Sequence, residues 1–501
     1  MSCPLEQCIR RLPIICALFP SLLLAQSASG ALLLSSPQSV VATDSTHAQP
    51  APPGPKPVEA VMRPEFKNLR FDELWTGAMR SRHWDDEIKA IPLAPHVALT
   101  IGGQLRWREE FAQNYNFSSP SDNYGQSRVL LSADLQVGEA HGVHGRAYGE
   151  FRDAQSYNRD LPGGTRQSDA DRADYQNLFV DLGYARSFVR YGRQEVVANR
   201  ERLIGVPDWS NTRRAFQGTR IMLVRGAFAF DALDARPVVV RLNTSDFGDT
   251  TTRFRTLAVG SAPGAKALLT GLPATWQAYW YEQVVTAATP ARRLTTGGRV
   301  AWTFGGSAKT SQGYGFESEG AVQSGAVGAR QIRAWFWTTE AQTQFRSVRG
   351  VPTLVVGLEE ASGDRNATDA KLEAFNQLYG AAHGHGGYAD VFGRANARET
   401  HVISTWDPFR VLNLRAAWYR YDRLRLEDGV YNKQNALLRA ASGSTDRHAG
   451  DEVDITSSLS VSRHLKIIAG HAWVLPGAFL VHTPESARQE RWGYAGTTFT
   501  F

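Results

Sequence analysis

Repeated alternation of apolar and polar residues is the feature that most limits how this chain can fold. Four stretches show it clearly, at residues 104–111, 127–138, 412–419 and 452–461. A period of two places successive side chains on opposite faces of a β-strand, so each stretch predicts a strand with one apolar and one polar face. The 127–138 stretch sets Val129, Leu131, Ala133, Leu135 and Val137 against Arg128, Ser132, Asp134 and Gln136.

Alternation alone also fits a soluble sandwich or propeller, in which one strand face packs on a core and the other meets water. The stretches are about ten residues long, which is the tilted span of an outer-membrane strand. The final stretch alternates Gly493, Ala495, Thr497 and Phe499 and ends on Phe501, a pattern that resembles the terminal strand of outer-membrane barrels. Interfacial aromatic girdles, with core packing as the alternative, are predicted from Trp107, Trp302, Trp335, Trp337, Trp418 and Trp492.

The chain is predicted to be an all-β protein, a transmembrane antiparallel up-and-down β-barrel with long extracellular loops. Lipid offers no partner to a free backbone amide, so a membrane sheet must close on itself. About 400 residues at roughly 22 per strand and connection give about 18 strands, enough to leave an aqueous lumen. No apolar run beyond the N-terminal region is long enough for a membrane-spanning helix.

The N-terminal region predicts export. Residues 1–28 read as a cleavable signal peptide, with Arg10 and Arg11 before an apolar run and Ala25–Ser27 as a small-residue cleavage site. A lipoprotein reading through Cys16 is disfavoured because Ile15 is bulky for the usual processing site. Residues 29–96 are expected to form a Pro-rich linker and periplasmic segment, and residues 97–501 the barrel.

Composition points to anions and excludes cysteine chemistry. Of the 55 Lys and Arg residues, 8 are Lys and 47 are Arg, although a GC-rich gene would also enrich Arg. The guanidinium group binds carboxylate, phosphate or sulfate bidentately, unlike the point charge of Lys. All three cysteines, Cys3, Cys8 and Cys16, lie in the first 16 residues. A disulfide framework, a Cys-ligated zinc and a Cys nucleophile are therefore excluded from the mature protein.

Motifs for enzymes and metals are weak. The chain has no His-Glu-x-x-His motif, no Gly-x-Ser-x-Gly elbow and no phosphate-binding loop. The pairs His141/His144 and His383/His385 sit in Gly-rich segments, where solvated loop histidines are favoured over metal ligands. Asp364–Asp369 has oxygen ligands at the spacing of a calcium loop but contains an arginine, so a surface turn is favoured over a loop Ca²⁺ site. We predict no catalytic residue, no protein metal site and no cofactor.

If the apolar faces meet lipid, the same parity sends a set of charged residues to the lumen. They admit two interpretations. Ion pairs could brace a wide barrel, or guanidinium groups could replace the solvation that an anionic polymer loses in the pore, in several weak sites. The predicted lumen residues are Arg106, Arg108, Arg128, Arg146, Arg152, Arg190 and Arg415, with Glu110, Asp134, Glu150, Asp181, Glu452 and Asp454.

Three blocks of sequence resemble the alginate export family of outer-membrane porins, and together they cover the chain from about Gly103 to Phe501. The third block is Glu452–Ile455 with Gly470 and Pro476–Gly477. The second block is Ala361–Asp364, Phe375–Tyr379, His383, Gly387, Asp390 and Asn396. The first block is Tyr191–Gln194, Arg202–Gly205, Trp209–Asn211, Arg213–Gly218 and Arg220.

The resemblance implies an 18-stranded monomeric barrel with a constricted, electropositive pore that conducts mannuronate-type polymer to the cell exterior. It adds Arg193, Arg202, Arg214 and Arg220 to the lumen candidates. Two positions depart from the family pattern, because Gln217 stands where Asp is usual and Asn199 where Gly is common. The missing acid would change how nearby arginines are balanced, so the substrate is not fixed by the resemblance.

The sequence thus predicts a channel of the bacterial outer membrane for passive, anion-selective passage of an acidic, alginate-like polysaccharide. The alternative is a general porin for uptake of small anionic solutes or sugar acids. A hydrolase at the barrel rim has support only from inward carboxylates and histidines. Expected partners are an anionic polysaccharide or oligosaccharide, outer-membrane lipid and the barrel assembly machinery, with no nucleic acid, and the chain is expected to be a monomer.

Overall fold

The structure is a computed structural model that describes residues 64–75, 83–139, 141–242, 244–263, 265, 274–304, 312–381 and 383–501. The predicted signal peptide, residues 1–28, and the Pro-rich linker lie outside the described residues. No helix in the described part of the chain is long and apolar enough to cross a membrane.

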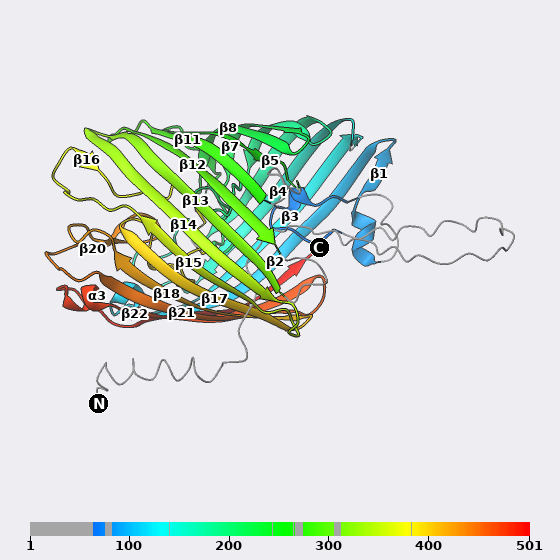
Figure 1. Ribbon diagram of the computed structural model, residues 1–501. Helices are drawn as coiled ribbons and strands as arrows, with labels where there is room; N and C mark the ends of the chain where they lie inside the picture. Colours follow the sequence, from blue (N-terminus) through cyan, green and yellow to red (C-terminus); the bar gives the residue numbers. More distant parts are fainter. Residues whose placement is uncertain are drawn as a thin grey trace, which may run out of the picture.

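Eighteen antiparallel strands close into one barrel, as predicted, and β23 pairs back onto β2 to complete it (Figure 1). Almost every strand pairs with the next one along the chain, as in an up-and-down barrel. The wall consists of β2 (Val97–Gln113), β3 (Asp122–Gly138), β4 (Val143–Tyr157), β5 (Asp171–Tyr184), β6 (Ser187–Gln194), β7 (Phe216–Arg225), β8 (Phe228–Val239), β10 (Thr252–Ser261), β11 (Ala274–Val285), β12 (Ala291–Phe304), β13 (Gln312–Val327), β14 (Arg330–Phe345), β15 (Thr353–Ala361), β17 (Ala397–Phe409), β18 (Leu412–Arg423), β21 (His448–Ser460), β22 (Leu465–Pro476) and β23 (Glu490–Thr500).

Short helices and short strands lie at the two ends of the barrel. The end that holds Phe501 and short connections such as 409–412 is called the turn end here, and the opposite end, with the connections 195–215, 362–396 and 424–447, is called the loop end (Figure 1). The short elements are η1 (Arg70–Asp72), η3 (Trp84–Ile88), β1 (Ile91–Ala94), η4 (Tyr115–Phe117), β9 (Phe247–Gly248), β16 (Lys371–Leu372), β19 (Val430–Tyr431), β20 (Leu437–Arg439) and α3 (Ala478–His482).

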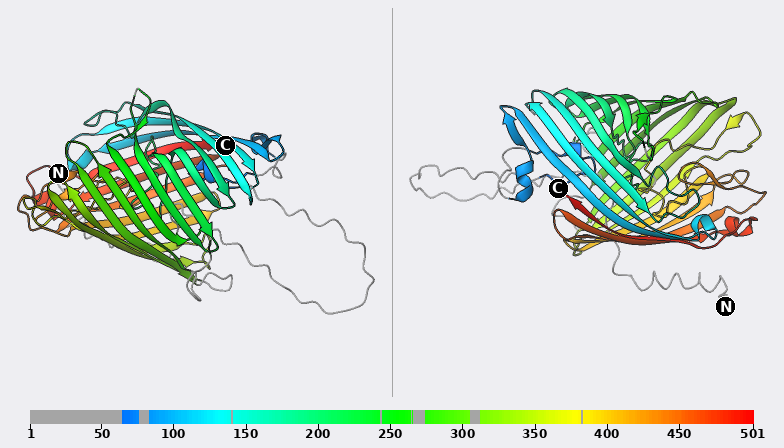
Figure 2. Two further views of the ribbon diagram at one scale, coloured as in Figure 1. Left: turned by 90° about the horizontal axis from the view of Figure 1, so that it is seen from above. Right: turned by 180° about the vertical axis from the view of Figure 1, so that it is seen from behind.

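The two faces of the wall have the parity that the alternation predicts. On β2, Leu105 and Trp107 are 45% and 43% exposed, whereas Arg106 and Arg108 between them are 8% and 1% exposed. The strands of the wall are tilted (Figure 2). Apolar side chains cover their outside, and charged side chains lie inside. This is the reverse of a soluble core, and it fits a wall that faces lipid on one side and a polar interior on the other.

The prediction of an outer aromatic girdle is wrong for one of its six tryptophans, Trp492. Trp107 is exposed on the outer face, and Trp302, Trp335, Trp337 and Trp418 share the outward parity of their strands. Trp492 points inward instead, between the buried Glu490 and Tyr494 of β23, and is 7% exposed. The terminal strand is apolar on both faces at this point, so aromatic character alone did not reveal which face Trp492 occupies. It packs with the inward loops.

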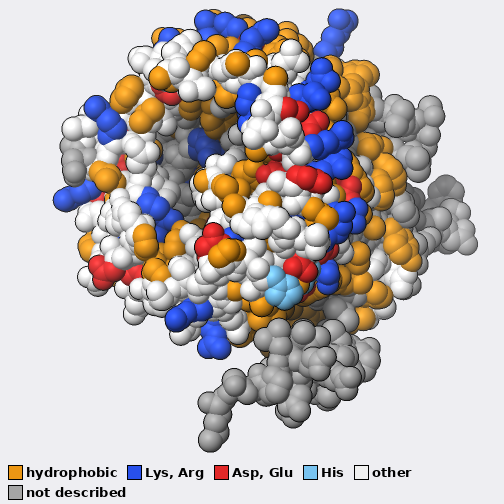
Figure 3. Space-filling model, turned by 90° about the vertical axis from the view of Figure 1, so that its left-hand side faces the viewer, with side chains coloured by type: hydrophobic (Ala, Val, Ile, Leu, Met, Phe, Trp, Pro, Cys, Tyr) orange, Lys and Arg blue, Asp and Glu red, His pale blue; other side chains and the backbone are white. Residues whose placement is uncertain are grey.

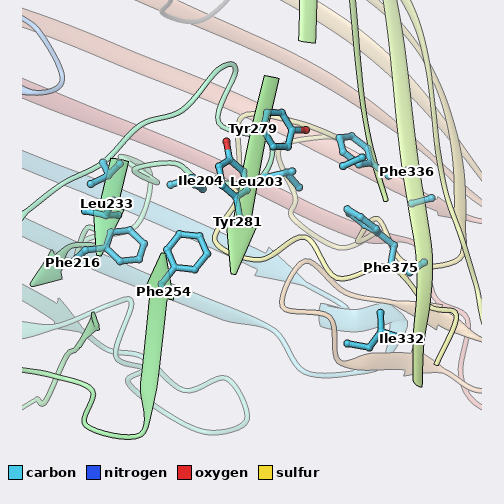
Figure 4. Packing of buried hydrophobic residues seen from close by; sticks show 14 of the residues in the cluster. Leu203, Ile204, Phe216, Leu233, Phe254, Tyr279, Tyr281, Ile332, Phe336 and Phe375 are labelled. Carbon is cyan, nitrogen blue, oxygen red and sulfur yellow. The ribbon is translucent and has the colours of Figure 1, made fainter. Parts of the chain in front are cut away.

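Two loops from the loop end fold into the barrel and pair with each other. Ile204 of the 195–215 loop forms a parallel bridge with Tyr379 of the 362–396 loop. Backbone hydrogen bonds secure it, from Gly205 N to Tyr379 O (3.0 Å) and from Tyr379 N to Leu203 O (2.9 Å). Leu203 and Ile204 pack in an internal cluster with Phe216, Phe254 and Phe375, among others, drawn from strands β7, β10 and the second loop (Figure 4). The lumen is therefore narrowed by a packed pair of loops.

The segment before the barrel contacts the lumen from the turn end. Phe71 in η1 is 3% exposed and packs edge-on against Tyr148 of β4 and Phe179 of β5, at centroid distances of 5.6 and 5.3 Å. Arg70 donates a hydrogen bond to the carbonyl of Phe501 (2.6 Å), and Lys89 donates one to the carbonyl of Ile101 (2.6 Å). These contacts dock residues 67–75 and 83–90 onto the inner side of the turn end.

Candidate functional site

Arginines of the strands line the inner wall in pairs with carboxylates. Arg190 donates Nε and Nη2 to the two oxygens of Asp181 (2.7 and 2.8 Å), and Arg146 binds Asp134 in the same parallel way (2.7 and 2.6 Å). Such bidentate pairs are among the strongest polar contacts in proteins and hold neighbouring strands together. Further inner pairs are Arg108–Glu110 (2.6 Å), Arg152–Asp246 (3.0 Å), Arg152–Asp171, Arg220–Asp231 (2.7 Å) and Arg415–Asp454 (3.6 Å).

Arg106 and Arg128 reach from the wall to the tip of the 195–215 loop. Arg106 Nη1 donates to the carbonyl of Asp208 (2.6 Å), and Arg128 Nη2 binds its carboxylate (2.7 Å). Arg213 approaches the same carboxylate at 3.4 Å. Partial loss of solvation inside the lumen disfavours the charge of Asp208, but Arg128, Arg213 and Arg106 outweigh this effect and hold the pKa of the carboxyl well below its usual range. Three cations thus fasten one loop aspartate.

Arg202 plays the corresponding part at the junction of the two loops. Its guanidinium lies 2.6 Å from Glu317, 2.5 Å from Glu340 and 3.4 Å from Glu319, and Glu359 is 3.8 Å away. The side chain is 1% exposed, so the site is a buried cation held by four carboxylates. Removing it would leave uncompensated acids inside the barrel, which is strongly unfavourable.

The remaining predicted lumen residues have other partners. Arg214 donates to the carbonyls of Tyr379 and Gly380 and so ties the two loops together. Arg193 lies opposite the exposed Leu178 in the sheet register, so its position on β6 faces outward, not into the lumen as predicted. Its guanidinium binds Asp174 at the loop end (3.0 Å). Glu150 accepts hydrogen bonds from Tyr148 (2.8 Å) and Asn177 (3.3 Å).

A cavity of about 1060 Å³ lies at the turn end, where β14, β17 and β21 end and β18 begins. Its polar lining combines one acid, Asp407, with three arginines and with inward amide and hydroxyl side chains. Among the described residues, neither Arg349 nor Arg410 has a carboxylate oxygen within 4.0 Å of its guanidinium. The basic, amide and hydroxyl side chains of the lining include Arg346, Arg349, Arg410, Gln344, Asn413 and Ser458.

Sequence reasoning missed these three arginines. Arg346 and Arg349 lie in the connection after β14, and Arg410 lies between β17 and β18, outside the alternating stretches on which the prediction rested. A signal was present, because two short turns of the chain contribute three arginines to one end of the barrel. Only the closed barrel brings these turns to the same mouth.

The histidines and the oxygen-rich segment considered as metal ligands in the sequence contact protein groups in the structure. His383 stacks between Trp209 (4.2 Å) and Tyr388 (4.5 Å), and His385 Nε2 lies 2.5 Å from the carbonyl oxygen of Arg200. Asp364 pairs with Arg330 at 2.5 Å. Within the residues that the structure describes, one group of three carboxylates could meet at a metal, namely Asp171, Asp174 and Asp246, and Arg152 and Arg193 already contact it.

The sequence pattern described for alginate export proteins matches residues 97–494, nearly the whole barrel. The chain belongs to the alginate export family. The backbone conformation accounts for Asn199, one of the two positions that depart from the predicted family pattern, because its φ is 52°. Asparagine is one of the few side chains that adopt this left-handed region readily. Gln217, at the other departure, lies on the exposed face of β7, away from the inner arginines.

Solved structures give the same fold for this alginate export family member. The outer-membrane protein OpdK from Pseudomonas aeruginosa is 13% identical, with a TM-score of 0.54 over 80% of this chain and 98% of its own. OprD from Pseudomonas aeruginosa is 10% identical, with a TM-score of 0.54 over 80% and 93%. OccK2 (OpdF) in complex with glucuronate, from the same organism, is 12% identical, with a TM-score of 0.51 over 80% and 96%. No curated protein matches the sequence.

Family and fold together place the protein in the bacterial outer membrane as a channel. Outer-membrane barrels have short periplasmic turns and longer extracellular loops. The turn end is therefore periplasmic and the loop end extracellular. The arginine-lined cavity then lies at the periplasmic mouth, and the paired loops lie in the extracellular half of the lumen.

Proposed function

We propose that this channel conducts an acidic, alginate-like polysaccharide passively and with preference for anions. The observation that carries the proposal is the periplasmic cavity, whose lining includes Arg346, Arg349 and Arg410 but one carboxylate, Asp407. Most arginines on the inner wall are already paired with acids, so they contribute little net charge to a passing anion. The cavity lining, by contrast, includes Arg349 and Arg410, for which no carboxylate oxygen of the described residues lies within 4.0 Å.

The chemistry of the lining suits a uronate polymer. A guanidinium group binds a carboxylate with two parallel hydrogen bonds, and Gln344, Asn413 and Ser458 offer amide and hydroxyl groups to sugar hydroxyls. Several weak sites of this kind favour entry without preventing release, which conduction requires. Movement would follow the concentration gradient, since no motif for energy coupling is evident in the sequence.

Planar-bilayer recording tests the proposal. In a KCl gradient the reversal potential of the wild-type channel should show anion preference, and mannuronate oligomers should block the current. The variant R346Q/R349Q/R410Q should lose most of that preference and block at least about tenfold more weakly, because three charge-assisted contacts are removed. Cation preference of the wild type, or block unchanged in the triple variant, would overturn the proposal.

The matched control is Arg225→Gln. Arg225 is the last residue of β7, near the same periplasmic end, but it is exposed on the outer face of the wall. The control should leave selectivity and block unchanged. Oligomer length separates the polymer from the small-anion alternative, since a polymer path should bind longer mannuronate chains more tightly and a small-solute pore should not.

A further inference from the structure

The outer surface of the barrel carries a second group of arginines, distinct from those of the lumen. At the extracellular ends of β8, β10, β11 and β12, charged residues stand at outward positions in two neighbouring rows across the sheet. The lower charged row is Asp234, Arg255 and Glu282, which are direct register partners. The outer arginine row, one step nearer the extracellular end, contains Arg236, Arg253 and Arg292.

The register fixes the spacing of the outer arginine row. Arg253 lies opposite Val284, and Val284 lies opposite Arg292, so these two arginines are separated by one strand. Arg236 follows directly after Ala235, the partner of Phe254, and therefore stands beside Arg253. With strands about 4.8 Å apart, the row spans roughly 15 Å of the outer wall.

The lower charged row neutralises only part of this charge. Arg253 Nε binds Asp234 (2.7 Å), while Arg255 Nη1 and Arg292 Nε each bind Glu282 (2.8 Å). Three arginines thus share two carboxylates, and Arg236 donates to the backbone carbonyl of Asp249 (3.2 Å), so the two rows hold two more arginines than acids. Arg253 and Arg292 side chains are 51% and 62% exposed, so donor groups of both remain open to the outside.

The surface below the charged rows is apolar. The next outward positions toward the periplasm include Leu257, Val259 and Phe230, which are 46%, 43% and 38% exposed, and Trp280 on β11 is the register partner of Leu257. The change from apolar to charged side chains occurs within one step of the register. The charged rows therefore stand at the boundary where hydrocarbon gives way to the head groups of the outer leaflet.

Outward arginines are concentrated at this end of the molecule. Figure 3 views the face that carries α3 and β20, the extracellular end, and shows basic side chains around its edge. Five further exposed arginines lie at the extracellular ends of other strands, whereas Arg225 is the exposed one at a periplasmic strand end among the described strands. The five are Arg172, Arg333, Arg398, Arg420 and Arg491.

We propose that Arg236, Arg253, Arg255 and Arg292 form a binding site for a phosphorylated glycolipid of the outer leaflet, of the lipopolysaccharide kind. Guanidinium groups bind phosphate oxygens bidentately, and the excess charge at the head-group boundary matches a lipid whose phosphates sit at that depth while its acyl chains lie along Leu257 and Val259. Exposed ion pairs within the rows add little stability by themselves, so their arginines can turn to an external phosphate at small cost.

Binding of purified lipid A to the full-length protein in detergent micelles tests this site. Native mass spectrometry with bisphosphorylated lipid A should show a lipid-bound wild-type barrel, and R236Q/R253Q/R292Q should bind at least about tenfold more weakly. Lipid A without phosphates should bind wild type no better than it binds this variant. Equal binding of bisphosphorylated lipid A to the two proteins would overturn the proposal.

The control is R398Q/R420Q/R491Q, which removes the same charge from the extracellular ends of β17, β18 and β23. Its affinity for lipid A should change less than twofold, and equal loss in both triple variants would show a diffuse basic belt instead of a site. Inorganic phosphate at the lipid concentration should not displace the lipid; displacement would identify a simple phosphate site and contradict the glycolipid. Both triple variants should keep the heat-modifiable gel mobility of a folded barrel.

Discussion

Arginine side chains in this protein join neighbouring strands, hold the inward loops, and form charged rows on the outer face of the barrel. The sequence predicts on which face of a strand an arginine lies, but not which of these roles it has. Parity correctly placed Arg106, Arg128 and Arg190 on the inner face of the wall. It could not tell that Arg190 binds a neighbouring strand, whereas Arg106 binds a loop carbonyl 102 residues away. A guanidinium partner depends on which segments the closed barrel brings together, and no local pattern records that.

Asp208 gives a prediction at the scale of one residue. Asp208→Asn removes the charge shared by Arg128, Arg213 and Arg106, and we expect the free energy of unfolding at pH 7 to fall by about 1 kcal/mol, because the side chain is 46% exposed and water screens the pairs. The folded pKa lies below the unfolded value, so the stabilisation is present above pH 4 and is lost on further acidification. Urea unfolding in lipid vesicles measures it.

The pH dependence of the free energy of unfolding separates the loss of the Asp208 charge from a change in packing caused by the new side chain. The difference between wild type and Asp208→Asn should shrink between pH 4 and pH 2, because the carboxyl of the unfolded wild-type chain takes up a proton there while that of the folded chain stays ionised. Asp160→Asn, in an exposed part of the 158–170 connection, is the control and should be neutral at every pH. A constant difference down to pH 2 would contradict the assignment.

At the scale of elements, strands followed from the sequence and the inward loops did not. A strand with one face toward lipid and one polar face must alternate apolar and polar side chains, so β3 and β18 could be predicted from their own residues. The 195–215 and 362–396 loops pack on each other and on β7 and β10, and their apolar residues have no fixed period. Trp492 was misplaced for the same reason, since it faces these loops.

The docked N-terminal segment predicts a change in conductance. Phe71 packs edge-on against the stacked rings of Tyr148 and Phe179 at the periplasmic mouth. Phe71→Ala should weaken docking by about 3 kcal/mol and raise single-channel conductance as the mouth clears. Leu74→Ala is the control, because Leu74 belongs to the same segment but is 74% exposed. Equal conductance of wild type and Phe71→Ala would show that this segment does not restrict the pore.

For the whole molecule, closure is the property on which stability depends, because an open edge would leave backbone amides unpaired in lipid. The sequence anticipated closure and about 18 strands, but not the residues that fit together where the first and last strands meet. There, Gly103 and Phe501 exchange backbone hydrogen bonds of 2.9 and 3.0 Å. The Phe501 ring lies over Gly103, so the chain is closely packed at the seam between β2 and β23.

Gly103→Val should therefore destabilise the whole barrel. A Cβ atom at this position would lie 2.6 Å from the Leu130 carbonyl oxygen and 2.7 Å from Cζ of Phe501, and a backbone carbonyl cannot move without disturbing the β2–β3 ladder. We expect a loss of about 1–3 kcal/mol and a lower temperature of conversion to the unfolded band on gels. Gly149→Val, where a Cβ meets only Leu178 Cδ1 at 3.8 Å, should unfold at the wild-type temperature. If Gly103→Val and Gly149→Val both unfold at the wild-type temperature, close packing at Gly103 does not hold the first strand to the last.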